Sequence, residues 1–266
     1  MPTYDDKTSE PGVSARRIRA FTPADVRTWE HIEGGIRLGS VVGEGYGRMS
    51  VGFTQLDAGT RAPLLAPYEE VWIVTAGTMI VDSDDGSVSA RPGDLIALRA
   101  ASRGELRVEA DVEMIALAYP PAWEIDSAAW ESARARSAAG PSAVVLSPGG
   151  SPSPWTRGER QELFAAHGKA DSAQNHFGVG FWRADTQADV EFFTRHDNLV
   201  AATAGQFEIH VGEDPNCDGS PAPAGRGLVM IRQGEFAYLP AGAAGTLSAA
   251  PGAELAWAQQ TFPPLS

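Results

Sequence analysis

The sequence predicts an all-β protein built from two tandem copies of one β unit, and three observations lead to this fold class. The stretch from Ala66 to Gly77 starts near paired carboxylates, continues as an apolar run and ends at glycine, like a buried strand closed by a turn. The same pattern returns at an offset of 128 residues, from Glu70 to Asn198 and from Gly77 to Gly205. Short strand-like runs between turn signals fill both halves, which is typical of a barrel or sandwich. Repetition at one long offset indicates a duplicated domain.

The first unit is predicted to occupy residues 16–122, after a polar N-terminus (1–15) whose composition predicts disorder. Thr22 and Pro23 predict a short helix, because Thr favours the N-cap position and Pro the first helical position. Strand-like runs then follow one another, and Pro120-Pro121 closes the unit.

A connector is predicted over residues 123–174. Asp126 or Ser127 can cap a helix that reaches about Arg136. The Ser-, Pro- and Gly-rich run that follows, 147–154, predicts an irregular surface loop, and a further short helix is predicted over 156–166. The second unit covers residues 175–266, and the two units are expected to pack against each other.

Composition excludes several classes of function. The net charge of −13 and a pI near 4.8 argue against nucleic acid or an anionic membrane as partner. No apolar run approaches the roughly 20 residues of a membrane span, and the N-terminus has no apolar signal core. Cys217 is the only cysteine, which excludes an internal disulfide and a cysteine-based zinc site. We therefore expect a cytoplasmic protein with a small-molecule ligand, and a homodimer is left open.

The two units resemble the cupin superfamily, whose first motif is G-x5-H-x-H-x3-4-E-x6-G. Glu70 and Gly77 match the end of that motif. Gly86, followed after five residues by Pro92-Gly93-Asp94, fits the start (G-x5-P) of the second motif. Within the superfamily the first half is similar to the ethanolamine-utilisation cupin family, through residues 49–53, 68–71, 92–94 and 118–123. The resemblance implies a bicupin, two tandem jelly-roll barrels with a helical and loop connector.

The resemblance also implies that the metal ligands of cupins are lost here. Glu70 is the one ligand of four that survives in the first half. The other positions carry Leu64 and Ala66 (or Pro63 and Leu65 with a longer spacer) and approximately Gly104. The second half carries Phe192, Thr194, Asn198 and approximately Gly245. One carboxylate does not hold a transition metal, so neither a metal nor another cofactor is expected.

Glu70 is the candidate catalytic residue. By alternation it shares a strand face with Trp72, and the cupin register turns that face into the barrel. A carboxyl group in an apolar cavity beside an indole has a raised pKa, which suits a general acid or base. The alternative is a structural carboxylate bonded to Tyr68 or to an arginine. Tyr68, Trp72 and Leu64 are the candidate substrate-binding residues, whereas Glu69 points the other way and is expected to be a surface charge.

The second half offers weaker candidates. His196 and Asn198 share a strand face and are predicted, with Tyr238, to contact a ligand in a second cavity. The alternatives are an exposed turn for His196 and core packing for Tyr238. His210 is expected to face outward, and a non-cupin metal site of His176, His196 and His210 is left open.

The leading functional hypothesis is a metal-independent enzyme that acts on a small, partly apolar organic molecule. Its reaction would be an isomerisation, a cyclisation or a lyase-type elimination, with a biosynthetic pathway as one setting, and Glu70 would be the general acid or base. Such proton chemistry requires only a positioned group of tuned pKa and a site that excludes water. The alternative is a non-catalytic bicupin that binds a small molecule or acts as a scaffold.

Overall fold

The computed structural model describes residues 17–43, 46, 49–65, 67–135, 143–148, 176–212 and 227–260. The strands of the first barrel are β2 (Glu30–Ile32), β3 (Ile36–Val42), β4 (Ser50–Leu56), β5 (Arg61–Leu65), β6 (Glu69–Ser83), β7 (Gly86–Ala90), β8 (Leu95–Leu98), β9 (Arg103–Tyr119) and β10 (Ala143–Leu146). Those of the second are β1 (Arg19–Phe21), β11 (Phe177–Arg183), β12 (Ala188–Phe193), β13 (Asn198–Ala204), β14 (Gln206–Val211), β15 (Leu228–Arg232), β16 (Phe236–Leu239), β17 (Ala244–Ala249) and β18 (Glu254–Gln260). The helices are η1 (Pro23–Asp25), η2 (Ala122–Glu124) and α1 (Ser127–Ala135).

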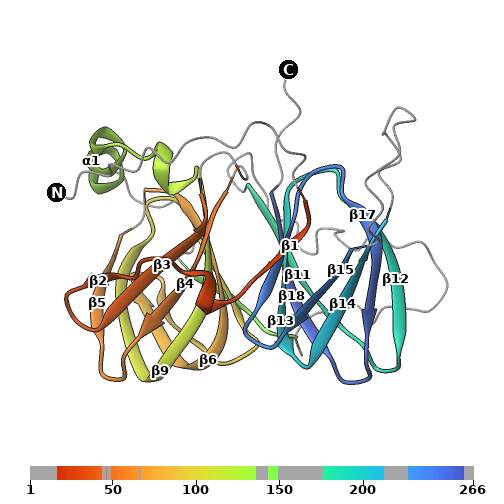
Figure 1. Ribbon diagram of the computed structural model, residues 1–266. Coiled ribbons are helices and arrows are strands. Elements are labelled where there is room, and N and C mark those ends of the chain that lie inside the picture. The colour runs from red at the N-terminus through yellow and green to blue at the C-terminus, as the bar shows by residue number, and fades with distance from the viewer. Residues whose placement is uncertain are drawn as a thin grey trace.

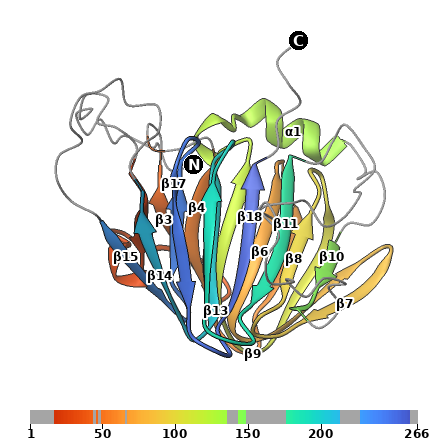
Figure 2. The same cartoon turned by 90° about the vertical axis from the view of Figure 1, so that its right-hand side faces the viewer.

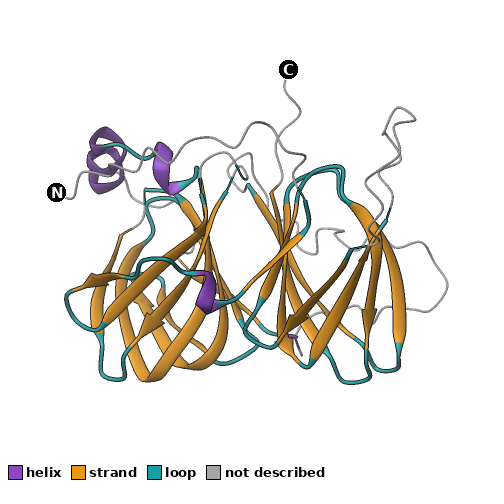
Figure 3. Ribbon diagram, in the orientation of Figure 1, coloured by secondary structure: helices purple, strands orange, loops and turns teal. Residues whose placement is uncertain are grey.

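The all-β prediction is confirmed: two β-barrels stand side by side, and the few helices lie outside them (Figures 1 and 3). The first barrel is a nine-stranded sheet in the order β10-β8-β6-β9-β4-β3-β2, with β5 paired to β9 and β7 to β6. The second barrel consists of a five-stranded sheet, β1-β16-β13-β18-β11, and a four-stranded sheet, β12-β17-β14-β15. All of the strand pairs with a described register are antiparallel.

Each barrel receives one strand from the chain that precedes the other barrel. β1 comes before the first barrel and pairs with β16 of the second, while β10 comes before the second barrel and pairs with β8 of the first. β8 and β16 are equivalent strands in the two copies, so the exchange is reciprocal. The sequence did not predict β10, which lies in the connector. The exchange ties each barrel to its neighbour through backbone hydrogen bonds.

Strand alternation distributes the apolar side chains over three cores. On β6, Trp72 and Val74 point into the first barrel, whereas Val71 and Ile73 point into a core between the barrels. The second barrel contributes Leu199 and its neighbours to this shared core and has an interior core of its own. Seen from the side of the second barrel, β13 and β18 lie in front of β6 and β9 (Figure 2). The predicted packing of the two units against each other is thus confirmed.

Gly77 does not close its strand as the sequence pattern suggested. β6 continues from Glu69 through Gly77 to Ser83, and its pairing with β9 shifts register around this residue. Gly77 has a φ of 78°, and a Cβ there would lie 2.0 Å from the carbonyl oxygen of Asp111. The glycine therefore allows a bulge that bends the strand, which then continues in the sheet.

Two helix predictions agree with the structure. Thr22 caps the short 3-10 helix η1, with Asp25 completing a capping box. α1 begins at Ser127 and ends at Ala135, close to its predicted bounds. The N-terminal residues 1–15, the helix predicted over 156–166 and Cys217 lie outside the described residues, as does most of the predicted loop at 147–154.

Candidate functional site

The first barrel contains a cavity of about 180 Å³. Its walls come from β3, β4, β6 and β9, and η2 contributes at one end. Most of the lining is apolar, and the polar lining residues are Ser40, Ser50, Thr54, Tyr68, Glu70 and Trp72. A mostly apolar cavity with a few converging polar groups is the usual form of a small-molecule site.

Glu70 lies on the inner face of β6 and borders this cavity, as its predicted alternation with Trp72 requires. Its side chain is half-buried, because the part that is free of protein contact faces the cavity. Burial raises the pKa of Glu70 to about 8, and a hydrogen bond from the Trp72 indole opposes that rise. At neutral pH most of the Glu70 population is therefore a neutral acid that can donate a proton.

Tyr68 directly precedes β6, lines the same cavity as Glu70 and contacts α1. Burial raises the pKa of the Tyr68 phenol, and the nearby charge of Glu70 raises it further. The Tyr68 ring meets the Trp130 ring of α1 edge-on, with centroids 6.4 Å apart. Arg103 donates from its guanidinium to the carbonyl oxygens of Ala133 and Arg134 at the C-terminal end of α1. These contacts hold α1 across one end of the first barrel (Figures 1 and 2).

Glu69 is buried, so its prediction as a surface charge is wrong. It is 7% exposed, and its carboxylate accepts a hydrogen bond from the backbone N–H of His176 at 2.7 Å. The Nδ1 atom of His176 lies 3.1 Å from the other oxygen of that carboxylate, and the Tyr119 ring packs against the imidazole. Glu69 does point away from the cavity, as strand alternation predicts. The face of β6 on which it lies is covered by the start of β11 and is not exposed to solvent. The carboxylate therefore joins the two barrels.

The equivalent interior of the second barrel is filled by an indole. In the first barrel Gly52 of β4 pairs with Ala116 of β9, and both residues line the cavity. In the second barrel the equivalent pair is Gly180 and Trp257. A Cβ on Gly180 would lie 2.6 Å from the Trp257 ring, so the indole covers the glycine.

A second indole adds to this filling. Thr54 of the cavity corresponds to Trp182, which is 3% exposed and packs against Phe207 with ring centroids 5.8 Å apart. Thr54, Ala116 and their indole counterparts were not among the residues predicted from the sequence. An alignment of the two copies could have found them, because the same strand positions hold small residues in the first copy and tryptophan in the second.

Two of the second-barrel candidates, Asn198 and Tyr238, make buried hydrogen bonds within the protein. Asn198 is fully buried, and its amide N–H donates to the His196 carbonyl oxygen at 2.5 Å. Tyr238 is buried in the core between the barrels, where its hydroxyl donates to Asp197 at 2.8 Å. The core-packing alternative therefore describes Tyr238. His210 is exposed, as expected, and lies 3.5 Å from Glu208.

Leu64 is buried in the apolar core of the first barrel, where it pairs in register with Gly104. These two positions correspond to cupin metal ligands, and neither side chain can donate to a metal. Within the described ranges, no group of three or more His, Cys, Asp or Glu side chains is placed to hold a metal ion. The donor set around Glu70 therefore does not fit the metal site of the superfamily.

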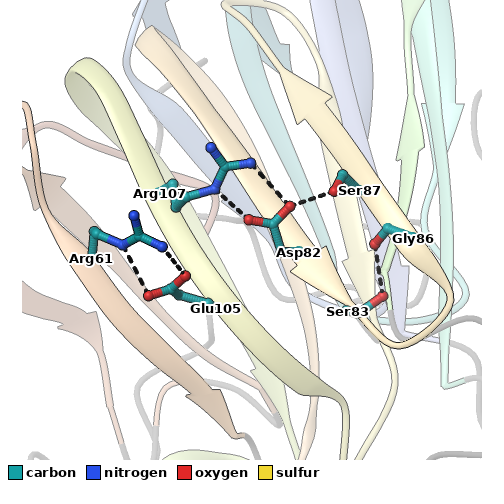
Figure 4. Close-up of polar contacts among 7 residues, drawn as sticks. All are labelled: Arg61, Asp82, Ser83, Gly86, Ser87, Glu105 and Arg107. Carbon is teal, nitrogen blue, oxygen red and sulfur yellow. Dashed lines mark hydrogen bonds and ion pairs between the residues drawn. The ribbon is translucent and has the colours of Figure 1, made fainter.

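Two ion pairs of the first barrel, Arg61–Glu105 and Arg107–Asp82, lie on its outer surface. Figure 4 shows Arg61 bonded to Glu105, and Arg107 bonded to Asp82, which also accepts from Ser87. Arg107 and Ser87 hold the pKa of Asp82 at about 2. Because Glu105 and Arg107 point outward from β9, Leu106 between them points inward and lies on the cavity wall.

Comparisons with known proteins agree with this architecture. Residues 35–125 match the family model of the ethanolamine utilisation protein EutQ. No curated protein matches the sequence. Among solved structures, YlbA from E. coli has a TM-score of 0.64 and 8% identity, and the match covers 96% of this chain and 95% of that one. AerE from Microcystis aeruginosa has a TM-score of 0.57 and 8% identity over 90% of this chain and 98% of that one. A deletion mutant of oxalate decarboxylase OxdC from Bacillus subtilis has a TM-score of 0.52 and 11% identity, and the match covers 91% of this chain and 77% of that one. At such identities the likeness concerns the fold.

No helix among the described residues combines the length and the apolar character that a membrane crossing requires.

Proposed function

The chain has the two-barrel fold of bicupins and its first barrel matches the EutQ family model; from that premise we propose that the first barrel is a metal-independent proton-transfer site for a small, largely apolar molecule. The observation that carries the proposal is Glu70, a raised-pKa acid on the wall of a ligand-sized cavity. An isomerase, cyclase or lyase needs such a group, because each reaction moves a proton onto or off the substrate.

The cavity volume limits the size of the substrate. An engineered apolar cavity of about 150 Å³ holds benzene, and the cavity beside Glu70 measures about 180 Å³. The substrate is therefore about the size of one six-membered ring with a small substituent.

The residues of the cavity would act together as follows. Protonated Glu70 donates its proton to an oxygen or a leaving group of the substrate, and the Trp72 N–H stabilises the carboxylate that forms. The same carboxylate can then remove a proton from carbon, which returns Glu70 to its acid form. The apolar walls keep water away from the reacting atoms.

Deuterium incorporation tests this function. Chelator-treated protein is incubated in D2O with a panel of ring-sized ketones, and incorporation at carbon is followed by NMR. We expect incorporation that persists after chelation and is lost in Glu70→Gln. Incorporation that requires an added metal, or that is equal in the variant, would contradict the proposal. Saturable binding without any exchange would instead favour the non-catalytic binding role.

A further inference from the structure

The described lining of the first-barrel cavity has an acidic side chain and no basic one. Among the described residues that border it there is no Lys, Arg or His. Glu70 is the lining group that ionises closest to neutral pH, and Tyr68 is the other titratable lining group. From this lining we propose that the cavity selects uncharged ligands that accept a hydrogen bond and rejects small organic anions. The inference rests on the proposed function, because it names the substrate class of the same site.

An anion that entered this cavity would lose its water without gaining a counter-charge, which is strongly unfavourable. The donors that the lining offers are uncharged: they are the hydroxyls of Ser40, Ser50, Thr54 and Tyr68 and the acid form of Glu70, while the Trp72 indole already donates to Glu70. Uncharged donors do not supply the positive charge that a desolvated anion requires. An uncharged amide or ketone is different, because its oxygen can accept the proton of the neutral Glu70 acid while its ring contacts the apolar walls.

The groups around Glu70 predict how this selectivity depends on pH. From β6 itself, the Trp72 indole faces the cavity with Glu70, and Tyr68, which directly precedes β6, faces it too. From β3, β4, β9 and η2, the described lining residues carry no ionisable side chain. Glu69 faces the opposite side of β6, where it pairs with His176. Ionisation of Glu70 above pH 8 therefore removes a donor for neutral ligands and adds a repulsive charge against anions.

Benzamide and benzoate test the inference, because they have nearly the same shape and differ in charge. Their binding is measured by titration calorimetry between pH 6 and pH 9, where benzoate is ionised. We expect benzamide to bind at pH 6 and benzoate to bind at least about a hundredfold more weakly. Benzamide affinity should fall as the pH rises through 8 in the wild type and stay constant in Glu70→Gln. Glu69→Gln, the same change on the opposite face, should keep the pH dependence of the wild type.

The outcomes separate this inference from the function on which it rests. Benzoate binding as tightly as benzamide would overturn the charge selectivity and leave the cavity as a ligand site. If neither compound binds at millimolar concentration, the proposed ligand site itself fails, and the inference fails with it. Ala116→Trp, which fills the cavity, should abolish benzamide binding and thereby locate the bound ligand.

Discussion

Glu70→Gln is expected to lower turnover by roughly a hundredfold or more while it makes the protein more stable at alkaline pH. The amide has nearly the same shape as the acid, so the cavity and the Trp72 contact surface stay in place. It cannot exchange a proton with a substrate, and this removes the chemistry. It also cannot ionise, and this removes the cost of a buried charge. Turnover of a substrate from the ketone panel and denaturant unfolding measure the two effects.

The pH window of the stability effect follows from the pKa of Glu70. The carboxyl has an ordinary pKa of 4.5 in the unfolded chain and about 8 in the folded protein. Below about pH 4.5 both states hold the proton, so the wild type pays no ionisation cost. Between 4.5 and 8 the unfolded chain loses the proton while the folded protein keeps it, and the free energy of unfolding falls as the pH rises. The wild type should therefore be less stable than Glu70→Gln by up to about 5 kcal/mol above pH 8.

Glu69→Gln is the matched control for this prediction. It makes the same change one residue away, at a carboxylate that is bonded to His176 between the barrels. We expect it to keep turnover and to show no gain in stability at alkaline pH, because it loses charge-assisted contacts. Equal turnover in the wild type and Glu70→Gln would show that Glu70 is a structural carboxylate.

Ala116→Trp is expected to abolish ligand binding and turnover while the fold persists. The second barrel already carries tryptophan at the equivalent position, opposite Gly180, and the first barrel has Gly52 opposite Ala116. An indole at position 116 can therefore enter the space that the ligand would occupy. Overfilling a core costs about 1–3 kcal/mol, so the variant should remain folded. Calorimetric titration with benzamide and circular dichroism check the two expectations.

Ala110→Trp provides the comparison, because Ala110 lies on the same strand and is exposed. This variant should bind benzamide like the wild type. If Ala116→Trp also binds benzamide with unchanged affinity, the ligand site lies elsewhere in the protein.

Much of the fold could be predicted from the sequence, because duplication and strand alternation are local signals. The offset between Glu70 and Asn198 revealed the two units, and alternation placed Glu70 and Trp72 on one face of β6. The role of Gly77 was harder to predict, since a glycine with a positive φ is found in turns and in bulges alike. Only the position of Asp111 on β9 decides between them.

Residues that depend on distant contacts could not be placed from sequence. Glu69 is buried because His176, 107 positions further along the chain, packs over it. Tyr238 points toward the first barrel. The sequence of its strand does not show which of the two strand faces packs against the other barrel. The cavity exists because Ala116 is small where the second copy has Trp257. That contrast becomes visible in the sequence only after the strand register is known.

The most direct test of the central claim, that Glu70 is a neutral acid inside a ligand cavity, is an infrared titration of its carboxyl group. The carbonyl band of a protonated carboxyl disappears when the proton leaves, and a difference spectrum between the wild type and Glu70→Gln isolates the band of Glu70. We expect this band to be present at pH 7 and to disappear with a midpoint near pH 8. A midpoint near 4.5, the ordinary value for glutamate, would show that Glu70 is charged at neutral pH and would contradict the account.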